Sequence, residues 1–445
     1  MHMPSSRVAG ALALALAVVV TARGQEIPEP TTNNPFSRVG VGELAPHAYA
    51  AQVGMGGIGV GFNDSHIASP TNPAALGALR FTSFQVGVGL DRSRLEADGV
   101  ENTNLDGNLD YLSLAFPLQN SLQRVLDGID SKWRNGMLFS LAPYSDIGYN
   151  VETFSDVEGL GEVATSTLGS GGYYRLQWGN GFAYGNRVRG GVNLSYLFGR
   201  ANAQQAVEPR GSDLAGTELT RTDALRARGL EVQFGLQYDV ALGQNAAGRS
   251  RKLTLGGTYA LGAELNGEAS RFSTNTYFLG AGGIDTVTFA TELDQTVALP
   301  DRAALGVYYS DAGRIGVGVD VTRTAWSSFR NTLAPEDRLD DALGVAVGGE
   351  FVPDPKAFGQ YWQLVRYRAG AYVNADPRPD VDAEAGFSLG LGMPVVRPRE
   401  EVSYVNLAVN AGRYGDAEGV RQRYVRLTVG FTLTDNTWFY KRRFN

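Results

Sequence analysis

Leu-Glu-Val-Gln-Phe-Gly-Leu-Gln-Tyr-Asp-Val, residues 230–240, alternates strictly between apolar and polar side chains. The side chains of a β-strand point alternately to opposite faces. Val232 and Phe234 therefore share an apolar face, and Glu231 and Gln233 share a polar one. A tilted transmembrane strand needs about 9–11 residues. The stretch predicts a strand with one face toward lipid and the other toward a water-filled lumen.

The same alternation recurs from about residue 81 to the C-terminal region, for example over residues 423–433. A soluble β-sandwich also alternates, but many such stretches without a helical interval favour an all-β fold, a transmembrane antiparallel β-barrel. The segment 202–226 is charged and looks external, which fits the order of the strands only if another strand lies within 170–184. A matching strand within 269–282 would then give sixteen. A short helix is expected over 119–133. Fourteen strands are predicted, near 81–91, 108–117, 137–151, 188–200, 229–241, 251–263, 285–298, 302–310, 314–324, 340–351, 364–374, 383–394, 401–411 and 422–433.

Residues 1–24 read as a secretory signal. Arg7 supplies a positive charge, residues 8–20 are apolar, and Ala22-Arg23-Gly24 fits a cleavage site. The alternative is a buried N-terminal helix. Residues 25–80 are rich in Gly, Pro and Asn and form a predicted N-terminal plug, and residues 81–445 form the predicted barrel. A signal sequence followed by a barrel places the protein in the outer membrane of a diderm (Gram-negative) bacterium.

Composition excludes several classes of function. The chain has no Cys, three His and a formal net charge of −7. An acidic chain without a basic block is not expected to bind nucleic acid. With two histidines left beyond the signal, we expect no metal site, no cofactor and no enzymatic activity. Residues 54–59 match the Gly-x-Gly-x-x-Gly pattern, but no βαβ context surrounds them, so glycine packing is the better interpretation.

The order of several short motifs resembles the FadL/TodX type of outer-membrane transporters of long-chain fatty acids and other hydrophobic compounds. The hatch-like stretches are Gly54-Met-Gly-Gly-Ile-Gly-Val-Gly-Phe-Asn-Asp64 and Asn72-Pro-Ala-Ala-Leu76. Leu299-Pro300, residues 305–309 and residues 366–372 follow in the expected order. The opening residues 34–42 and the closing residues 438–443 look like the Bacteroidetes-type branch of this superfamily.

This resemblance implies a fourteen-stranded barrel that is plugged by an N-terminal hatch. It implies passive uptake of hydrophobic small molecules, such as long-chain fatty acids, which leave sideways into the membrane lipid through a kinked third strand. The alternative is a PorV-like docking barrel, which partners a secretion system or a surface protein and transports nothing.

Candidate site residues follow from both arguments. Pro143 interrupts the third predicted strand, and since proline gives no ladder hydrogen bond, Pro143, Tyr144 and Ser145 predict a lateral kink, or else a proline at the rim. Arg366 and Arg368 lie on the polar face of their strand, where they either hold a substrate carboxylate or form a salt-bridge network. Phe62 and Ile67 either line a pocket or pack the plug, and Asn72 and Pro73 belong to the hatch motif.

Overall fold

The structure is a computed structural model. The predicted signal, most of the helix expected over 119–133 and the closing motif 438–443 lie outside the described residues. The model describes residues 30, 32–97, 99–119, 132–159, 161–210, 217–245, 248–277, 283–357, 359–379, 381–396, 402–415 and 419–435.

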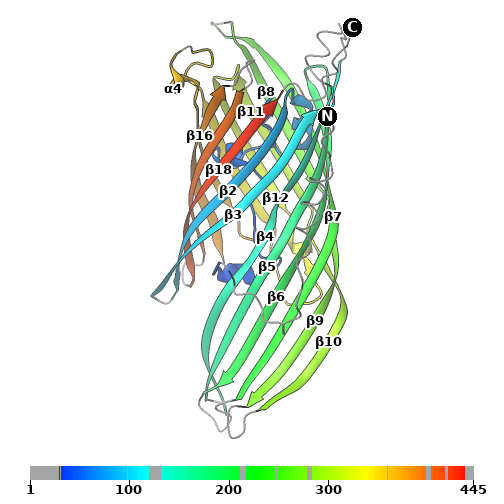
Figure 1. Ribbon diagram of the computed structural model, residues 1–445, viewed down its shortest axis with the longest axis vertical. Coiled ribbons are helices and arrows are strands. Elements are labelled where there is room, and N and C mark those ends of the chain that lie inside the picture. The colour runs from blue at the N-terminus through cyan, green and yellow to red at the C-terminus, as the bar shows by residue number, and fades with distance from the viewer. Residues whose placement is uncertain are drawn as a thin grey trace, which may run out of the picture.

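Fourteen antiparallel strands close into a ring, because the last strand, β18, pairs with the first, β2, from Arg421↔Glu96 to Asp435↔Thr82 (Figure 1). The predicted fold class and strand count are confirmed. In ring order the strands are β2 (Thr82–Ala97), β3 (Val100–Pro117), β4 (Trp133–Val157), β5 (Gly161–Tyr184), β6 (Val188–Pro209), β7 (Thr217–Gln244), β8 (Ser250–Ala260), β11 (Arg302–Asp311), β12 (Ile315–Thr324), β14 (Ala342–Phe351), β15 (Arg366–Asn374), β16 (Asp382–Val396), β17 (Val402–Gly415) and β18 (Arg421–Asp435).

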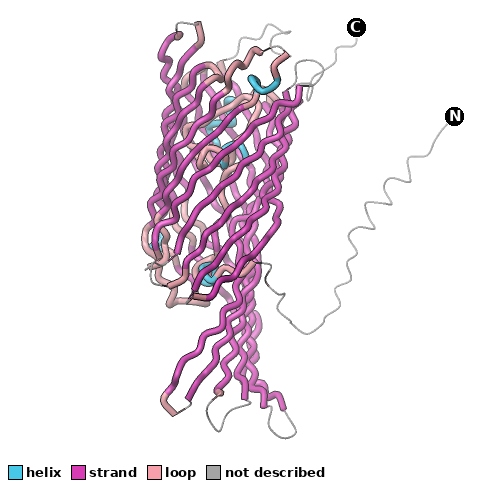
Figure 2. Tube along the Cα trace, turned by 90° about the vertical axis from the view of Figure 1, so that its left-hand side faces the viewer, coloured by secondary structure: helices cyan, strands magenta, loops and turns pink. Residues whose placement is uncertain are grey.

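A hairpin outside the ring changes which strands make up the fourteen. The second half of β7 pairs with β8, but its first half pairs with β9 (Glu264–Tyr277), and β9 pairs with β10 (Gly283–Ala298). This hairpin and the far ends of β4 to β7, here called the extension, project beyond the ring (Figure 2). The predicted strand at 285–298 therefore lies outside the ring, and β5 takes its place.

Positive-φ glycines explain why β5 was absent from the predicted strands. Gly171 and Gly172 have φ values of 129° and 145°, which interrupt the alternation of side chains in the middle of the strand. The strands considered within 170–184 and 269–282 are both present, as parts of β5 and β9. With β5 in the ring, the charged segment 202–226 becomes the far ends of β6 and β7 in the extension.

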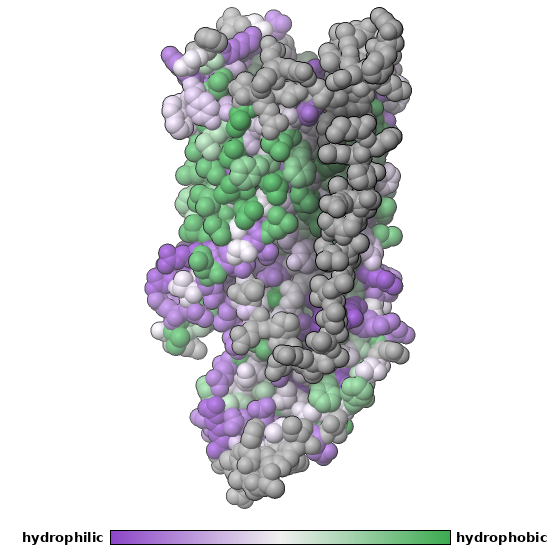
Figure 3. All heavy atoms as spheres, in the orientation of Figure 1, coloured by the Kyte–Doolittle hydropathy of each residue, from purple (hydrophilic) through white to green (hydrophobic). Residues whose placement is uncertain are grey.

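Apolar side chains form a belt around the outside of the ring (Figure 3). On β7 the outward-facing Leu230, Phe234 and Leu236 are 57%, 50% and 67% exposed, whereas the inward-facing Gln233 and Gln237 are buried. Such a belt suits hydrocarbon. Barrels of this kind have short periplasmic turns and longer external loops. The three-residue turns 185–187 and 312–314 lie at the end where β2 begins, so the extension marks the external end.

The segment 32–80 runs inside the ring and packs against small inward-facing positions. A Cβ added at Gly256 of β8 would lie 2.2 Å from the Val60 carbonyl oxygen, and one at Gly348 of β14 would lie 2.0 Å from that of Met55. Within the described residues, the model contains no helix with the length and apolar character to span a membrane. The short elements are η1 (Pro35–Arg38), β1 (Glu43–Leu44), α2 (Ala50–Val53), η2 (Pro73–Ala78), η3 (Trp326–Ser328), β13 (Arg330–Asn331) and α4 (Tyr361–Leu364).

Candidate functional site

The barrel wall parts between β3 and β4. These two strands pair only from Leu112↔Leu141 to Pro117↔Gly136, although both continue well beyond this ladder toward the external end. Pro143 lies two residues past the last pair and has no N–H to donate. The pairing of β4 with β5 also shifts register between Pro143 and Ser145. Residues 100–111 of β3 and 142–157 of β4 therefore border an opening, here called the β3–β4 gap.

The N-terminal chain covers this gap. Residues 32–45, here called the strap, pair with the free edge of β4: Glu43 lies opposite Asp146 in β1, and the Asn34 backbone N–H donates to the Gly148 carbonyl at 2.7 Å. Asn33 contacts both borders of the gap. Its side-chain oxygen accepts from the Asn150 backbone N–H at 2.9 Å, and its carbonyl accepts from Asn104 Nδ2 at 2.9 Å.

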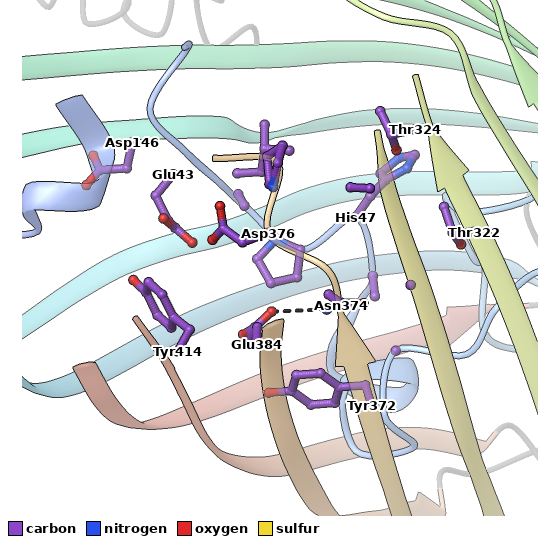
Figure 4. Close-up of a pocket in the computed structure, with 18 of the residues that line it drawn as sticks. Glu43, His47, Asp146, Thr322, Thr324, Tyr372, Asn374, Asp376, Glu384 and Tyr414 are labelled. Carbon is purple, nitrogen blue, oxygen red and sulfur yellow. Dashed lines mark hydrogen bonds between the residues drawn. The ribbon is translucent and has the colours of Figure 1, made fainter. Parts of the chain in front are cut away.

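A cavity of about 590 Å³ lies in the lumen between the strap and the barrel wall (Figure 4). This luminal cavity is within the size range of small-molecule sites, about 300–1,000 Å³. Its lining mixes carboxylates, aromatic rings and backbone. The carboxylates outnumber the arginines: Glu43, Asp91, Asp106, Asp110, Asp146, Asp320, Asp376 and Glu384 against Arg302, Arg378 and Arg426.

Arg378, in the loop between β15 and β16, anchors the strap to the external end of the barrel. Its guanidinium donates to the Phe36 carbonyl and lies 4.9 Å from the centre of the Phe36 ring. It forms ion pairs with Asp376 and, at 3.6 Å, with Glu43. Enclosure raises the pKa of Glu43 to about 7 against the opposing pull of Arg378. The Glu43 side chain nevertheless keeps 39% of its area open to the cavity, so solvent there moderates the shift.

A second hollow, here called the outer groove, lies on the outside of the wall and measures about 1250 Å³. It crosses β4 to β7 and reaches the β9–β10 hairpin. The luminal cavity and the outer groove share three lining residues, Asn108, Pro143 and Asp146, which come from the two borders of the β3–β4 gap. The gap is thus the place where the lumen and the outside of the barrel meet.

The proposed kink residues Pro143, Tyr144 and Ser145 lie together at this gap. Pro143 lines both hollows. Tyr144 is 7% exposed, and Arg175 stacks over its ring at 4.8 Å. The Ser145 hydroxyl donates to the Val41 carbonyl of the strap at 2.7 Å.

The predicted apolar residues of the plug lie elsewhere. Phe62 is 2% exposed and packs edge-on against Tyr308, with ring centroids 5.4 Å apart. Ile67 is 1% exposed and belongs to a cluster with Tyr404. Neither contributes to the lining of the two hollows. In the described structure both residues pack the inner segment against the barrel.

Asn72 and Pro73 start the η2 turn and tie the inner segment together. The Asn72 side chain caps the turn by accepting from the Ala74 N–H at 3.0 Å, and its amide donates to the Val60 carbonyl at 2.8 Å. Pro73 occupies the first position of the turn, which suits a residue without an N–H. Neither residue lines either hollow.

Both candidate arginines on β15 are engaged by protein groups. Arg366 bonds Asp64 Oδ2 at 2.8 Å and the Tyr404 hydroxyl at 3.1 Å. Arg368 bonds Glu350 Oε2 at 3.3 Å and Asn406 Oδ1 at 2.8 Å, and its side chain is fully buried. This arrangement is the salt-bridge alternative considered above.

Sequence reasoning missed the strap and Arg378. The strap is a Pro-, Asn- and Gly-rich stretch whose pairing partner lies about 100 residues away, so no local periodicity marks it. A usable signal was the free edge itself, because a mid-strand Pro143 requires a new partner for β4 beyond it.

No metal site is evident in the described part of the chain, where no group of three His, Cys, Asp or Glu side chains converges. The Gly-x-Gly-x-x-Gly stretch has a structural role here. The backbone N–H groups of Gly59 and Val60 donate to Asp320 Oδ2 at 2.7 and 2.8 Å, which fastens the inner segment to β12.

Solved structures with the same fold are transport proteins. The Pseudomonas putida toluene transporter TodX has a TM-score of 0.55 at 16% identity, covering 89% of this chain and 100% of its own. The Ralstonia pickettii toluene transporter TbuX has a TM-score of 0.55 at 13% identity, covering 88% and 98%. A Pseudomonas aeruginosa FadL homologue has a TM-score of 0.54 at 14% identity, covering 88% and 99%.

At these identities the likeness shows the fold alone, which is that of the FadL/TodX superfamily. No comparison identifies the Bacteroidetes-type branch, and no curated relative matches the sequence. The family model BamG matches residues 10–445, nearly the whole chain, and the protein therefore belongs to the BamG family.

Proposed function

We propose that this protein lets hydrophobic small molecules pass, without a cofactor or energy coupling, between the external end of the lumen and the membrane beside the barrel. The observation that carries the proposal is the continuity of the luminal cavity and the outer groove at Asn108, Pro143 and Asp146. Parted strands survive at membrane depth only where the free backbone groups meet protein or a water-filled cavity. A gap kept at such a place is best explained by passage.

The proposed location is the outer membrane of a diderm bacterium. The apolar belt, the closed ring and the signal-like residues 1–24 support this location together. Several proteins of the same fold are described by their titles as toluene or monoaromatic hydrocarbon channels or transporters. Hydrophobic compounds of this general kind are our proposed cargo.

The segment 25–80 acts as the plug in this proposal, and its strap is the moving part. Apart from the two residues of β1, the strap contacts β4 through isolated bonds rather than a long ladder. A ligand that enters from the external end meets the strap before it reaches the gap. Displacement of the strap from the β4 edge would then connect the cavity with the lipid.

The charge of the cavity bears on the class of cargo. Eight carboxylates and three arginines line it, and the two arginines once considered for a substrate carboxylate are paired with Asp64, Glu350 and Asn406. An ionised fatty acid would be repelled by such a lining. We therefore propose uncharged hydrophobic compounds as the preferred ligands, with long-chain fatty acids as the comparison.

A disulfide across β1 tests the proposal. Glu43 and Asp146 are opposed in an antiparallel pair, where Cα atoms lie about 4.5–5.5 Å apart, and the chain has no cysteine of its own. The Glu43→Cys/Asp146→Cys protein, reconstituted in liposomes, should take up radiolabelled toluene at least tenfold more slowly when oxidised than after reduction.

The control is Val409→Cys/Leu427→Cys, an opposed pair in the unbroken β17–β18 ladder. Its oxidation should leave uptake unchanged. Palmitate measured beside toluene tests the charge argument. Uptake by the oxidised Glu43→Cys/Asp146→Cys protein at the rate of the reduced form would contradict lateral passage beneath the strap.

A docking barrel is the second candidate, and one observation favours it. In the extension, Phe272 and Phe289 form an edge-on pair with centroids 5.9 Å apart, and Phe289 is 70% exposed beyond the apolar belt. Exposed aromatic residues of this kind suit a protein partner. A wild-type protein that takes up no toluene, and that loses a stoichiometric co-purifying protein on Phe289→Ser substitution, would favour docking over passage.

A further inference from the structure

Two rows of side chains cross the outer face of the wall where the apolar belt ends. In the first row Tyr174 lies opposite Phe198, and Phe198 lies opposite Arg228. In the second row Arg200 lies opposite Arg226. Both rows line the outer groove. Three arginines of neighbouring strands, here called the arginine patch, thus gather beside two aromatic rings.

Alternation fixes the direction in which these arginines point. Leu197, Leu225 and Ala227 are 0%, 2% and 4% exposed and belong to the apolar core inside the extension. Their neighbours along the same strands, Arg200, Arg226 and Arg228, are exposed on the opposite, outward face. The patch therefore faces whatever surrounds the barrel, not its lumen.

The patch is short of anionic partners within the protein. Arg200 Nε donates to the Asn202 side chain at 3.0 Å. Among the described residues, no carboxylate lies within ion-pair distance, 4.0 Å, of the three guanidinium groups. Glu268 lies opposite Arg226 and Asp294 opposite Glu268, so both carboxylates occupy the far end of the groove. Like charges directly opposite in a sheet, such as Arg200 and Arg226, are unfavourable unless an anion joins them.

The height of the patch on the barrel suggests what that anion is. On β7 the outward positions run from Tyr238 through Phe234 to Leu230 in the belt, and Arg228 is the next outward residue toward the external end. Tyr and other aromatic residues mark membrane–water interfaces, and Tyr174 and Phe198 lie in the same row as Arg228. The patch is thus level with the headgroups of the outer leaflet.

We propose that Arg200, Arg226 and Arg228 bind the phosphate of an anionic outer-leaflet lipid, whose acyl chains lie against the belt below. Guanidinium groups bind phosphate with two parallel hydrogen bonds. The outer groove continues from the patch to Pro143, so the bound lipid stands at the membrane side of the β3–β4 gap. The inference rests on the proposed outer-membrane location but does not depend on passage.

The test compares phosphorylated and dephosphorylated lipid. Purified protein in detergent is titrated with diphosphorylated lipid A, or with the same lipid after phosphatase treatment, and bound lipid is counted by native mass spectrometry. We expect at least tenfold tighter binding of the phosphorylated form, and loss of this preference in Arg200→Gln/Arg226→Gln/Arg228→Gln. The control is Arg94→Gln/Arg210→Gln, which removes exposed arginines that are already paired with Glu101 and Glu152.

Folding of each variant is checked by its heat-modifiable mobility in SDS gels. Inorganic phosphate is added in tenfold excess over lipid to separate a lipid site from a simple anion site. Equal binding by the triple variant, or displacement of the lipid by inorganic phosphate, would overturn the proposal. Toluene uptake is measured separately, so loss of lipid binding with normal uptake removes this inference and leaves the proposed function standing.

Discussion

Asn33 of the strap accepts a hydrogen bond from Asn104 of β3 through its carbonyl, while its own side chain accepts one from the β4 backbone at Asn150. One residue therefore connects two strands that do not pair with each other at this height of the wall. The contact explains how a barrel with an interrupted ladder can remain covered. It also indicates where the cover would first loosen.

Replacement of Asn33 by Ala should loosen the strap. It removes the bond to β4, which is worth about 0.5–1.5 kcal/mol, or roughly a two- to tenfold change in the open population. Val41 is 3% exposed under the strap and reports on opening after substitution to Cys. In the Val41→Cys background, Asn33→Ala should raise the rate of maleimide labelling by that factor.

Asn374→Ala is the matched control, since it removes an exposed side-chain bond to Glu384 that does not involve the strap. It should leave the labelling rate of Val41→Cys unchanged. Equal labelling rates for Asn33→Ala and its parent would show that the bridge does not hold the strap.

Two adjacent glycines of β8 should respond very differently to substitution by Ala. A Cβ at the inward-facing Gly256 would lie 2.2 Å from the Val60 carbonyl oxygen, whereas one at the outward-facing Gly257 would meet only Leu305 at 3.5 Å. Backbone cannot move aside as a side chain can, so Gly256→Ala should cost about 1–3 kcal/mol. Its temperature of heat modification in SDS gels should fall, and that of Gly257→Ala should remain within error of the wild type.

These glycines also show how far the sequence could predict the structure. Period-two alternation predicts the barrel because each lipid-facing strand must carry it, and stretches such as 230–240 and 423–433 are strands as expected. β5 escaped because Gly171 and Gly172 interrupt the alternation. The β9–β10 hairpin could not be told from ring strands, since pairing partners are set by distant residues.

The site was less predictable than the fold. Pro143 could be singled out because its missing N–H is a local property with a direct effect on pairing. The strap, Arg378 and the shared lining at Asn108 depend on contacts between segments far apart in the sequence. Arg366 carries the same charge whether it binds a ligand or Asp64, so only the structure shows its partner.

Arg366 and Asp64 should depend on each other for stability. Burial alone would raise the pKa of Asp64, but Arg366 and His66 hold it well below its usual range. Arg366→Gln leaves the Asp64 carboxylate buried without its partner, which should cost about 3–5 kcal/mol. The double variant Arg366→Gln/Asp64→Asn should recover much of that loss in the heat-modification assay. Additive effects of the two substitutions would contradict a coupled pair.

Glu43 should make the seating of the strap depend on pH. Its pKa is raised from 4.5 to about 7 in the folded protein, so between these values the folded state binds more protons than the unfolded one. Stability therefore falls as pH rises through this window. Glu43→Gln, which stays neutral, should match the wild type near pH 4.5 and slow labelling at Val41→Cys relative to it near pH 8.

The exposed Glu152→Gln in the extension serves as the control and should show no such crossover. Arg378 decides the sign of the result. If its ion pair with Glu43 at 3.6 Å outweighed the cost of enclosure, Glu43→Gln would loosen the strap at pH 8 instead of tightening it. Faster labelling of Glu43→Gln than of the wild type at pH 8 would therefore show that the strap is held by the charged pair, and uptake should then rise with acidity rather than with alkalinity.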